Sequence, residues 1–344
     1  MQIDFHYAAI RLLSEKAGFS PADSQIIAYA SQYIDDATNY RHIKIKGNLN
    51  IDYPRLVDGK FDPICTAHKG LQFLNDFKKS VQHKIYIPFH FLPPKEYEEG
   101  VEFDYITSPN SLLANNLINY SLHRFKINSS KIENLISLGI ALHTFADTWA
   151  HQGFSGIHSS QHNDIENIAI MKNGKWEKLN LFEQFEHNIL PDIGHAEAHS
   201  YPDLSFLKWK YTYAKTKKEV VRDNFQEFYE AAKTIYNILL DFNNKKSNWT
   251  SFEDKLIDCL KYETFDAEEK FEYYQKIFPE IGFYYNSNQW EKEAINISRK
   301  FVSLPQKMEI IKGDVTNKKD LKWFYFHKIA LEQRYYILKK CNLK

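Results

Sequence analysis

The sequence predicts an all-α fold, in which residues 1–344 form a single multi-helix domain with no β-structure beyond a small hairpin near residues 168–178. Two observations support this prediction. The chain has only 12 glycines and 11 prolines in 344 residues, so few positions interrupt a helix. Serine N-cap signals also precede several segments whose apolar residues recur with the helical period.

Two helices have clear start signals. Ser20 is an N-cap followed by proline at the first helical position and Asp23 at the third, which predicts a helix to about residue 37. Ser130 and Glu133 form a capping box. The helix that follows is apolar on nearly every side until Gly153 stops it, so we expect it to be buried. Further helices are predicted at residues 109–125, 222–242, 251 onward, 267–277, 289–300 and 318–340.

The segments between the helices, at residues 41–68 and 154–184, are expected to be irregular. Within the second, Asn173 and Gly174 are a turn signal that predicts the hairpin. No serine- or glycine-rich linker, internal repeat or low-complexity tract divides the chain, so we expect one domain. We expect its chemistry within residues 1–205, and we expect the helices of residues 206–344 to complete the core or cover the site.

The composition excludes several classes of function. Lys+Arg and Asp+Glu number 44 each, so the chain gives no strong nucleic-acid signal and no overall attraction to anionic membranes. The three cysteines are widely spaced, which excludes a thiolate zinc knot and a disulfide framework. We identify no Sec signal peptide and no transmembrane segment. We therefore expect a cytoplasmic protein, with non-classical secretion as the alternative.

The most informative segment is residues 141–151, in which His143, Asp147 and His151 recur every four residues. Residues at i and i+4 share one face of a helix, so the three side chains form one stripe. The two histidines are about 12 Å apart along the axis, which is too far for one ion but suits two neighbouring ions with the carboxylate between them. Because buried charge is costly unless it is paired or metal-bound, we expect zinc, with manganese or iron as alternatives. A buried polar network without metal is the other interpretation.

Two further pairs have the chemistry of metal ligands. Asp35 and Asp36 end the predicted helix of residues 21–37, where carboxylates oppose the helix dipole. A nearby cation would explain them, and a solvated helix end is the alternative. His195 and His199 repeat the i, i+4 spacing and could bind one ion, although Glu197 lies at the wrong offset for the general base of a zincin.

Other candidates are isolated in the sequence. Asp4 and His6 precede an apolar run near the N-terminus, and His68 and His90 lie in short segments before the predicted helix of residues 109–125. A lone histidine is more often structural than functional. Asp203 lies further along the chain and could ligate an ion or orient a histidine that does.

Taken in order, these motifs resemble the zinc-dependent phospholipase C and S1/P1 nuclease superfamily over about residues 1–205. The resemblance implies an all-α enzyme of that type, with a trinuclear zinc site that hydrolyses phosphodiesters. The chain also resembles a bacterial branch that opens Asp-Phe-His-Tyr and carries His-Thr-x-x-Asp-Thr-Trp-x-His-Gln. Both motifs occur here, beginning at Asp4 and His143.

By position, the resemblance assigns Asp147 as the carboxylate that bridges two ions. It assigns as further ligands His143, His151, His195, His6, Asp35 or Asp36, and His68. The chain departs from the family in four ways. The family's site begins with the amine of a processed N-terminal tryptophan, for which Asp4 is the nearest replacement. The spacing from Asp147 to His151 is two residues shorter than in the phospholipases. His199 replaces the final acid, and no export signal is present.

We therefore expect a metal-dependent phosphodiester hydrolase of the phospholipase C type that uses two or three zinc ions to activate water. We expect Asp35 or Asp36 to accept the proton of that water as well as to bind an ion. Neutral charge and many aromatic residues favour a phospholipid or another small phosphodiester as the substrate. Two alternatives stay open: a nuclease for single strands, which needs a basic, aromatic groove, and a non-catalytic helical module that metal stabilises.

Overall fold

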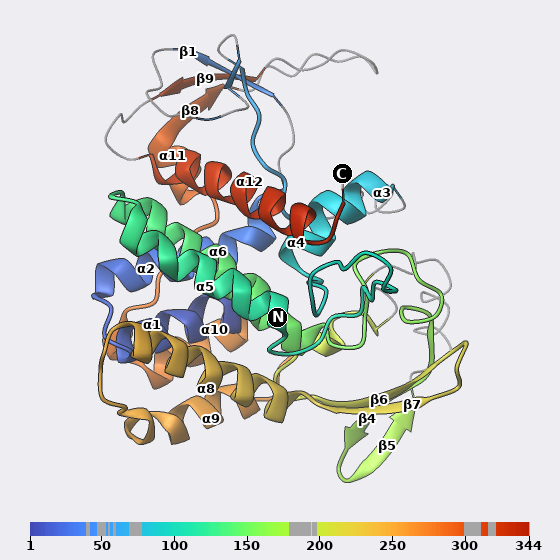
Figure 1. Cartoon of the computed structure of the whole chain (residues 1–344). Helices are drawn as coiled ribbons and strands as arrows, with labels where there is room; N and C mark the ends of the chain where they lie inside the picture. Colours follow the sequence, from blue (N-terminus) through green and yellow to red (C-terminus); the bar gives the residue numbers. More distant parts are fainter. Residues whose placement is uncertain are drawn as a thin grey trace.

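The computed structural model describes residues 1–38, 42–46, 53, 56–57, 60–68, 78–178, 194, 198–298, 311–315 and 321–343. Helices dominate, but two β-sheets flank them (Figure 1). The prediction of an all-α fold is therefore wrong, and the chain combines α-helices with β-sheets.

The helix α6 (Lys131–Ala150) lies at the centre of the helical core, and its residues from Glu133 onward are all buried, as the sequence predicts. The long helices that pack against it are α2 (Pro21–Asp36), α5 (Leu112–Ile127), α8 (Asn224–Phe242) and α12 (Lys322–Lys340). The other helices are η1 (Asp4–Ala9), α1 (Ile10–Lys16), α3 (Lys79–Val81), η3 (Gln82–Tyr86), α4 (Ile87–Phe89), η5 (Tyr201–Asp203), η6 (Trp249–Ser251), α9 (Glu253–Lys261), α10 (Ala267–Ile277), η7 (Pro279–Ile281) and α11 (Gln289–Ala294). Among the helices of the described residues, none combines the length and apolar character that a bilayer-spanning segment needs.

Both predicted N-caps are present. The hydroxyl of Ser20 accepts the N–H of Asp23 at 3.2 Å at the start of α2. The hydroxyl of Ser130 accepts the N–H of Glu133 at 3.4 Å at the start of α6. These side chains satisfy backbone N–H groups that have no partner within their own helix, which explains why both helices begin where the sequence predicts.

A glycine allows α2 and α6 to cross closely. A Cβ atom added at Gly139 would lie 2.8 Å from Cβ of Ala30 and nearer still to the carbonyl oxygen of Ile27. The absence of a side chain therefore lets the two backbones touch. This crossing sets the C-terminal end of α2 beside the C-terminal half of α6, where the candidate ligands lie.

The predicted hairpin is present as β4 (Ile165–Lys172) and β5 (Lys175–Lys178). Its turn residues Asn173 and Gly174 have φ of 49° and 75°, the left-handed backbone that this turn requires. The hairpin belongs to a larger antiparallel sheet with β6 (Lys208–Tyr213) and β7 (Glu219–Asp223), in the order β5-β4-β6-β7. This sheet extends from the end of the core near α8 (Figure 1).

A second sheet lies beyond α12 (Figure 1) and includes segments that were expected to be irregular or helical. Its strands are β1 (Ile43–Lys46), β2 (Leu56–Val57), β3 (Lys60–Phe61), β8 (Ile295–Ser298) and β9 (Ile311–Val315). The order is β2-β3-β1-β9-β8, with β1 and β9 parallel and the other neighbours antiparallel. The helix predicted at residues 289–300 therefore ends at Ala294, where β8 begins.

Candidate metal centre

The helix α6 places the predicted His-Asp-His stripe inside the protein. His143 is fully buried, Asp147 is 1% exposed and His151, which follows the last turn, is 4% exposed. Three elements from elsewhere in the sequence bring further histidines and carboxylates to this stripe. They form two groups of three side chains, and in each group the ligand atoms lie within 4.8 Å of one another.

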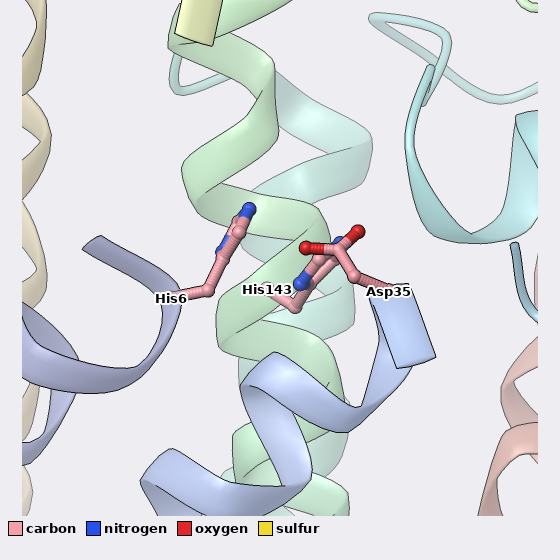
Figure 2. A group of neighbouring side chains, drawn as sticks. All are labelled: His6, Asp35 and His143. Atoms are coloured by element: carbon pink, nitrogen blue, oxygen red, sulfur yellow. The ribbon is translucent and has the colours of Figure 1, made fainter. Parts of the chain in front are cut away.

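The first group joins His6, Asp35 and His143, so we call it the first triad. His6 comes from η1 and Asp35 from the last turn of α2, on either side of α6 (Figure 2). The rings of His6 and His143 stack with their centroids 3.8 Å apart. His143 Nε2 lies 3.7 Å from Asp35 Oδ1. This is a nitrogen and oxygen donor set that suits zinc.

The second triad joins His90, His143 and Asp147. His90 Nδ1 lies 3.2 Å from Asp147 Oδ2 and 3.3 Å from His143 Nε2. His143 Nε2 and Asp147 Oδ2, one turn apart on α6, are themselves 3.3 Å apart. His143 therefore belongs to both triads, and because its Nε2 faces Asp35 as well as His90 and Asp147, this nitrogen would bind a single ion that draws on both triads.

Backbone carbonyls fix the protonation of two rings. His90 Nε2 donates to the carbonyl of Thr66 at 2.9 Å, and His151 Nδ1 donates to the carbonyl of His90 at 2.8 Å. A carbonyl oxygen only accepts, so the hydrogen of a neutral ring lies on that nitrogen. The opposite nitrogen of His90 then directs a lone pair at Asp147, and a proton or a metal ion is required between the two atoms. Carbonyl bonds of this kind commonly orient histidines that ligate metals.

A third group of donors surrounds the amino group of Met1. This group lies 2.8 Å from Asp147 Oδ1 and 2.9 Å from Asp203 Oδ1. His151 Nε2 also faces Asp203 Oδ1, at 3.2 Å. Burial would lower the pKa of the Met1 amino group, but these carboxylates and Asp35 outweigh it and raise the pKa to about 11. The position between the two carboxylates therefore holds a positive charge.

The carboxylate of Asp147 connects all three groups. Its Oδ1 faces the Met1 amine and His6 Nε2, and its Oδ2 faces His90 and His143. Burial alone would raise the pKa of Asp147, but His151, the amine and the other histidines hold its pKa well below the usual range. A buried, ionised carboxylate with both oxygens engaged is the geometry expected of a bridging ligand.

Two observations test whether a metal fits. His6 Nδ1 and His143 Nδ1 are buried and have no hydrogen-bond partner among the described residues. Burial and the neighbouring His143 also hold the pKa of His6 well below its usual value, so this ring stays neutral, as a metal ligand must. Imidazoles with unused nitrogens, gathered around three carboxylates, fit zinc or a similar ion.

Not every predicted ligand reaches the triads. Asp36 accepts the hydroxyl of Tyr285 at 2.5 Å and belongs to neither triad. Asp4 is buried, which raises its pKa against the opposing charges of Lys270 and the Met1 amine, and it also belongs to neither triad. Hence neither residue is a ligand in either triad.

The remaining predicted ligands have different outcomes. His68 is half-buried in the wall of the cavity beside the centre. His199 is half-buried with a φ of 50° and belongs to neither triad. His195 lies outside the described residues. The triad residue His90 and the carboxylate Asp203 were only secondary candidates, although the spacing from His199 to Asp203 is the same four residues as in the central stripe.

A small cavity gives access to the centre. It has a volume of about 180 Å³, and its walls include Asp35, His90, Asp147, His151 and Asp203. A wider cleft of about 700 Å³ shares some of these walls, and it extends along Asp36, Tyr285, Asn286 and Ser287. The centre therefore adjoins space for a ligand, as a catalytic site requires.

The four-stranded sheet supports the end of α6. Arg222, on β7, is 3% exposed, and its Nη2 donates to the carbonyls of Trp149 and Ala150 at 3.0 Å each. Its guanidinium pairs with Glu227. The last carbonyls of a helix have no partner within the helix, so Arg222 caps α6 just before His151.

Comparison with known proteins gives one match. A family model described as "Family of unknown function (DUF6765)" matches residues 1–341. No curated protein and no solved structure matches the chain.

Proposed function

The chain belongs to the DUF6765 family of unknown function, and we propose from its own centre that it is a metal-dependent phosphodiester hydrolase, similar to phospholipase C, with two or three zinc ions. The observation that carries the proposal is the carboxylate of Asp147. Each of its oxygens faces a different group of donors, and His143 belongs to both triads. A carboxylate whose two oxygens bind different ions is typical of polynuclear hydrolase centres.

The residues of the centre would hold ions among the side chains of the two triads. A further ion between Asp147, His151 and Asp203 would have to displace the Met1 ammonium or bind it as the neutral amine. When bound, such ions supply an activated water and stabilise the charge that develops on phosphate oxygens. Asp35 is 27% exposed at the cavity, and burial raises its pKa, so this carboxylate is the best placed to accept the proton of the attacking water. Phe91 stacks on His151 at 4.5 Å and keeps that ring in place.

The cleft favours a small substrate. Its described lining includes the carboxylates of Asp35 and Asp36 and no lysine or arginine. A groove for single-stranded nucleic acid would need basic side chains along the backbone of the strand. We therefore propose a phospholipid or another small phosphodiester as the substrate class. A cytoplasmic location is also proposed, since all three cysteines are free and buried.

The first test is the metal content of four proteins by mass spectrometry: wild type, Asp147→Asn, Asp35→Asn and Asp36→Asn. We expect stoichiometric zinc in wild type, less in the first two variants, and the wild-type amount in Asp36→Asn. The last variant is the matched control, because it removes the neighbouring carboxylate, which bonds Tyr285 instead. A folded wild-type protein that binds no metal, even after titration with zinc, would refute the proposal.

The second test is hydrolysis by the zinc-loaded protein. Phosphatidylcholine vesicles, bis(p-nitrophenyl) phosphate and single-stranded DNA are compared side by side. We expect turnover of the first two that is lost in Asp147→Asn. Turnover of DNA alone would favour the nuclease, and tight zinc binding without turnover of any substrate would favour a structural metal module.

A further inference from the structure

Thr66 lies where two ligand-bearing segments meet. It is fully buried. Its hydroxyl donates to the carbonyl of Ile34 at 2.6 Å, and its N–H donates to the carbonyl of Ala37 at 2.9 Å. Its own carbonyl accepts Nε2 of His90 at 2.9 Å. One residue thus contacts the end of α2, which carries Asp35, and the ring of His90.

The contacts to α2 replace an ordinary helix cap. The last four carbonyls of a helix lack partners within it, and a glycine in the left-handed conformation commonly supplies the turn that satisfies them. Here the residue after α2 is Ala37, whose φ is −79°. Thr66, distant in sequence, bonds the carbonyls on either side of the Asp35–Asp36 pair. The direction of the Asp35 side chain therefore depends on this bond.

The C-terminal helix α12 holds Thr66 from its other side. His327 Nδ1 accepts the N–H of Ile64 at 3.0 Å, and Arg334 Nη2 donates to the carbonyl of Cys65 at 2.8 Å. Arg334 is 8% exposed, and its guanidinium lies over the ring of Phe89, next to His90. Ile64 and Cys65, the two residues before Thr66, are thus hydrogen-bonded to α12.

We infer that Thr66 is a positioning residue of the centre: its hydroxyl and carbonyl groups set Asp35 and His90 together, and α12 holds its peptide through Arg334. The inference rests on the proposed metal centre but not on hydrolysis. It gives the C-terminal helix a role at a centre to which it supplies no ligand in either triad.

The test compares Thr66→Val, which keeps the shape and removes the hydroxyl, with Thr66→Ser, which keeps the hydroxyl. Zinc affinity is measured by competition with a chelating dye, and ligand geometry by the visible spectrum of the cobalt-substituted protein. We expect Thr66→Val to bind zinc about 10-fold more weakly or worse, the usual effect of losing a residue that orients a ligand. We expect Thr66→Ser to restore both the affinity and the cobalt spectrum.

A second readout needs no metal. In metal-free protein labelled with 15N-histidine, we expect the hydrogen on His90 Nε2, which the Thr66 carbonyl accepts, to exchange slowly with solvent in wild type and in Thr66→Ser, and faster in Thr66→Val. The His90→Ala spectrum assigns the signal. Ser121→Ala is the control, because it removes another buried hydroxyl that donates to a carbonyl, that of Ile118 on α5.

The outcomes separate this inference from the proposed function. Unchanged affinity, cobalt spectrum and hydrogen exchange at His90 Nε2 in a folded Thr66→Val would overturn the inference while the metal centre stands. A wild type that binds no zinc would overturn the proposed function, and the exchange measurement at His90 would still decide the role of Thr66. If Thr66→Val does not fold, Arg334→Met tests the same peptide from α12, with the same two readouts and the same expected direction.

Discussion

Substituting Gly139 by alanine should separate α2 from α6 and loosen the centre. The added Cβ would lie 2.8 Å from Cβ of Ala30 and nearer still to the carbonyl oxygen of Ile27. Carbon atoms in contact are normally about 3.5–4.0 Å apart, so the helices must separate by roughly 1 Å. Neither neighbour can rotate away, because one is backbone and the other is a Cβ atom.

The expected magnitude follows from two opposing terms. Alanine is more favourable than glycine inside a helix by about 1 kcal/mol, whereas overpacking a core commonly costs about 1–3 kcal/mol and sometimes more. Because the clash includes backbone, we expect a net loss of about 2 kcal/mol in the free energy of unfolding. The separation also reaches the first triad, since His143 lies one turn after Gly139 and Asp35 lies on α2, 3.7 Å away from it.

Urea unfolding with and without zinc measures both effects. We expect Gly139→Ala to lower the free energy of unfolding of the apo-protein and also to reduce the increment that zinc adds. Gly100→Ala is the control, because its Cβ would meet nothing within 4 Å; with a φ of 80° it should cost backbone strain but leave the zinc increment unchanged. An unfolding free energy for Gly139→Ala equal to or above that of wild type would refute the reasoning.

Three further outcomes are expected. Adding zinc at about a hundredfold excess over its Kd should stabilise the protein by about 2.7 kcal/mol, and a chelator should reverse the rise in Tm; no shift would contradict the metal centre. Arg222→Met should lower the free energy of unfolding by about 3–5 kcal/mol, because it leaves the half-buried Glu227 without its partner. The double variant Arg222→Met, Glu227→Leu should recover part of this loss. Equal losses in the single and double variants, measured by urea unfolding, would contradict the pairing. Burial lowers the pKa of Lys270 from 10.5 to about 8. Between pH 8 and 10.5 the unfolded chain therefore binds more protons than the folded protein, and the free energy of unfolding rises with pH. Lys270→Met should flatten that rise, and an unchanged slope would count against the burial effect.

Local signals made the helices predictable. The caps at Ser20 and Ser130 depend on residues three positions apart, and the stripe on α6 depends on residues four apart. Interactions over such short separations are specified by the sequence around them. The buried environment of α6 followed for the same reason, because its apolar residues cover every side of the helix.

The strands depend on partners that are distant in sequence. In β6, Trp209 and Tyr211 are buried and alternate with the more exposed Lys208 and Lys210, a period of two that predicts a strand but went unused in our prediction. The change from helix to strand at Ile295 is harder to predict, because the helical pattern before it contains no stop signal and β8 pairs with β9. The residues of β1 (Ile43–Lys46) and β8 also alternate apolar and polar, but the parallel pairing of β1 with β9 joins segments far apart in the chain. Because strand pairing is set by such packing, the order of the second sheet could not be derived from local sequence.

The adjacent carboxylates at the end of α2 show where an energetic argument from sequence stops. Two acids at a helix C-terminus oppose the dipole, and this conflict predicts a cation near that helix end. The dipole argument applies equally to Asp35 and Asp36, so it could not predict which of them faces the centre. Consecutive residues of a helix point in directions about 100° apart, so only one of the two can do so. Asp35 turns into the first triad, whereas Asp36 turns to the hydroxyl of Tyr285, about 250 residues away in the chain. Which of the two faces the centre is decided by the cap that Thr66 supplies and by the tyrosine, and both are long-range contacts. The pair of variants Asp35→Asn and Asp36→Asn therefore tests the fold and the centre at once: equal loss of zinc in both would mean that the helix end is oriented differently from the structure described.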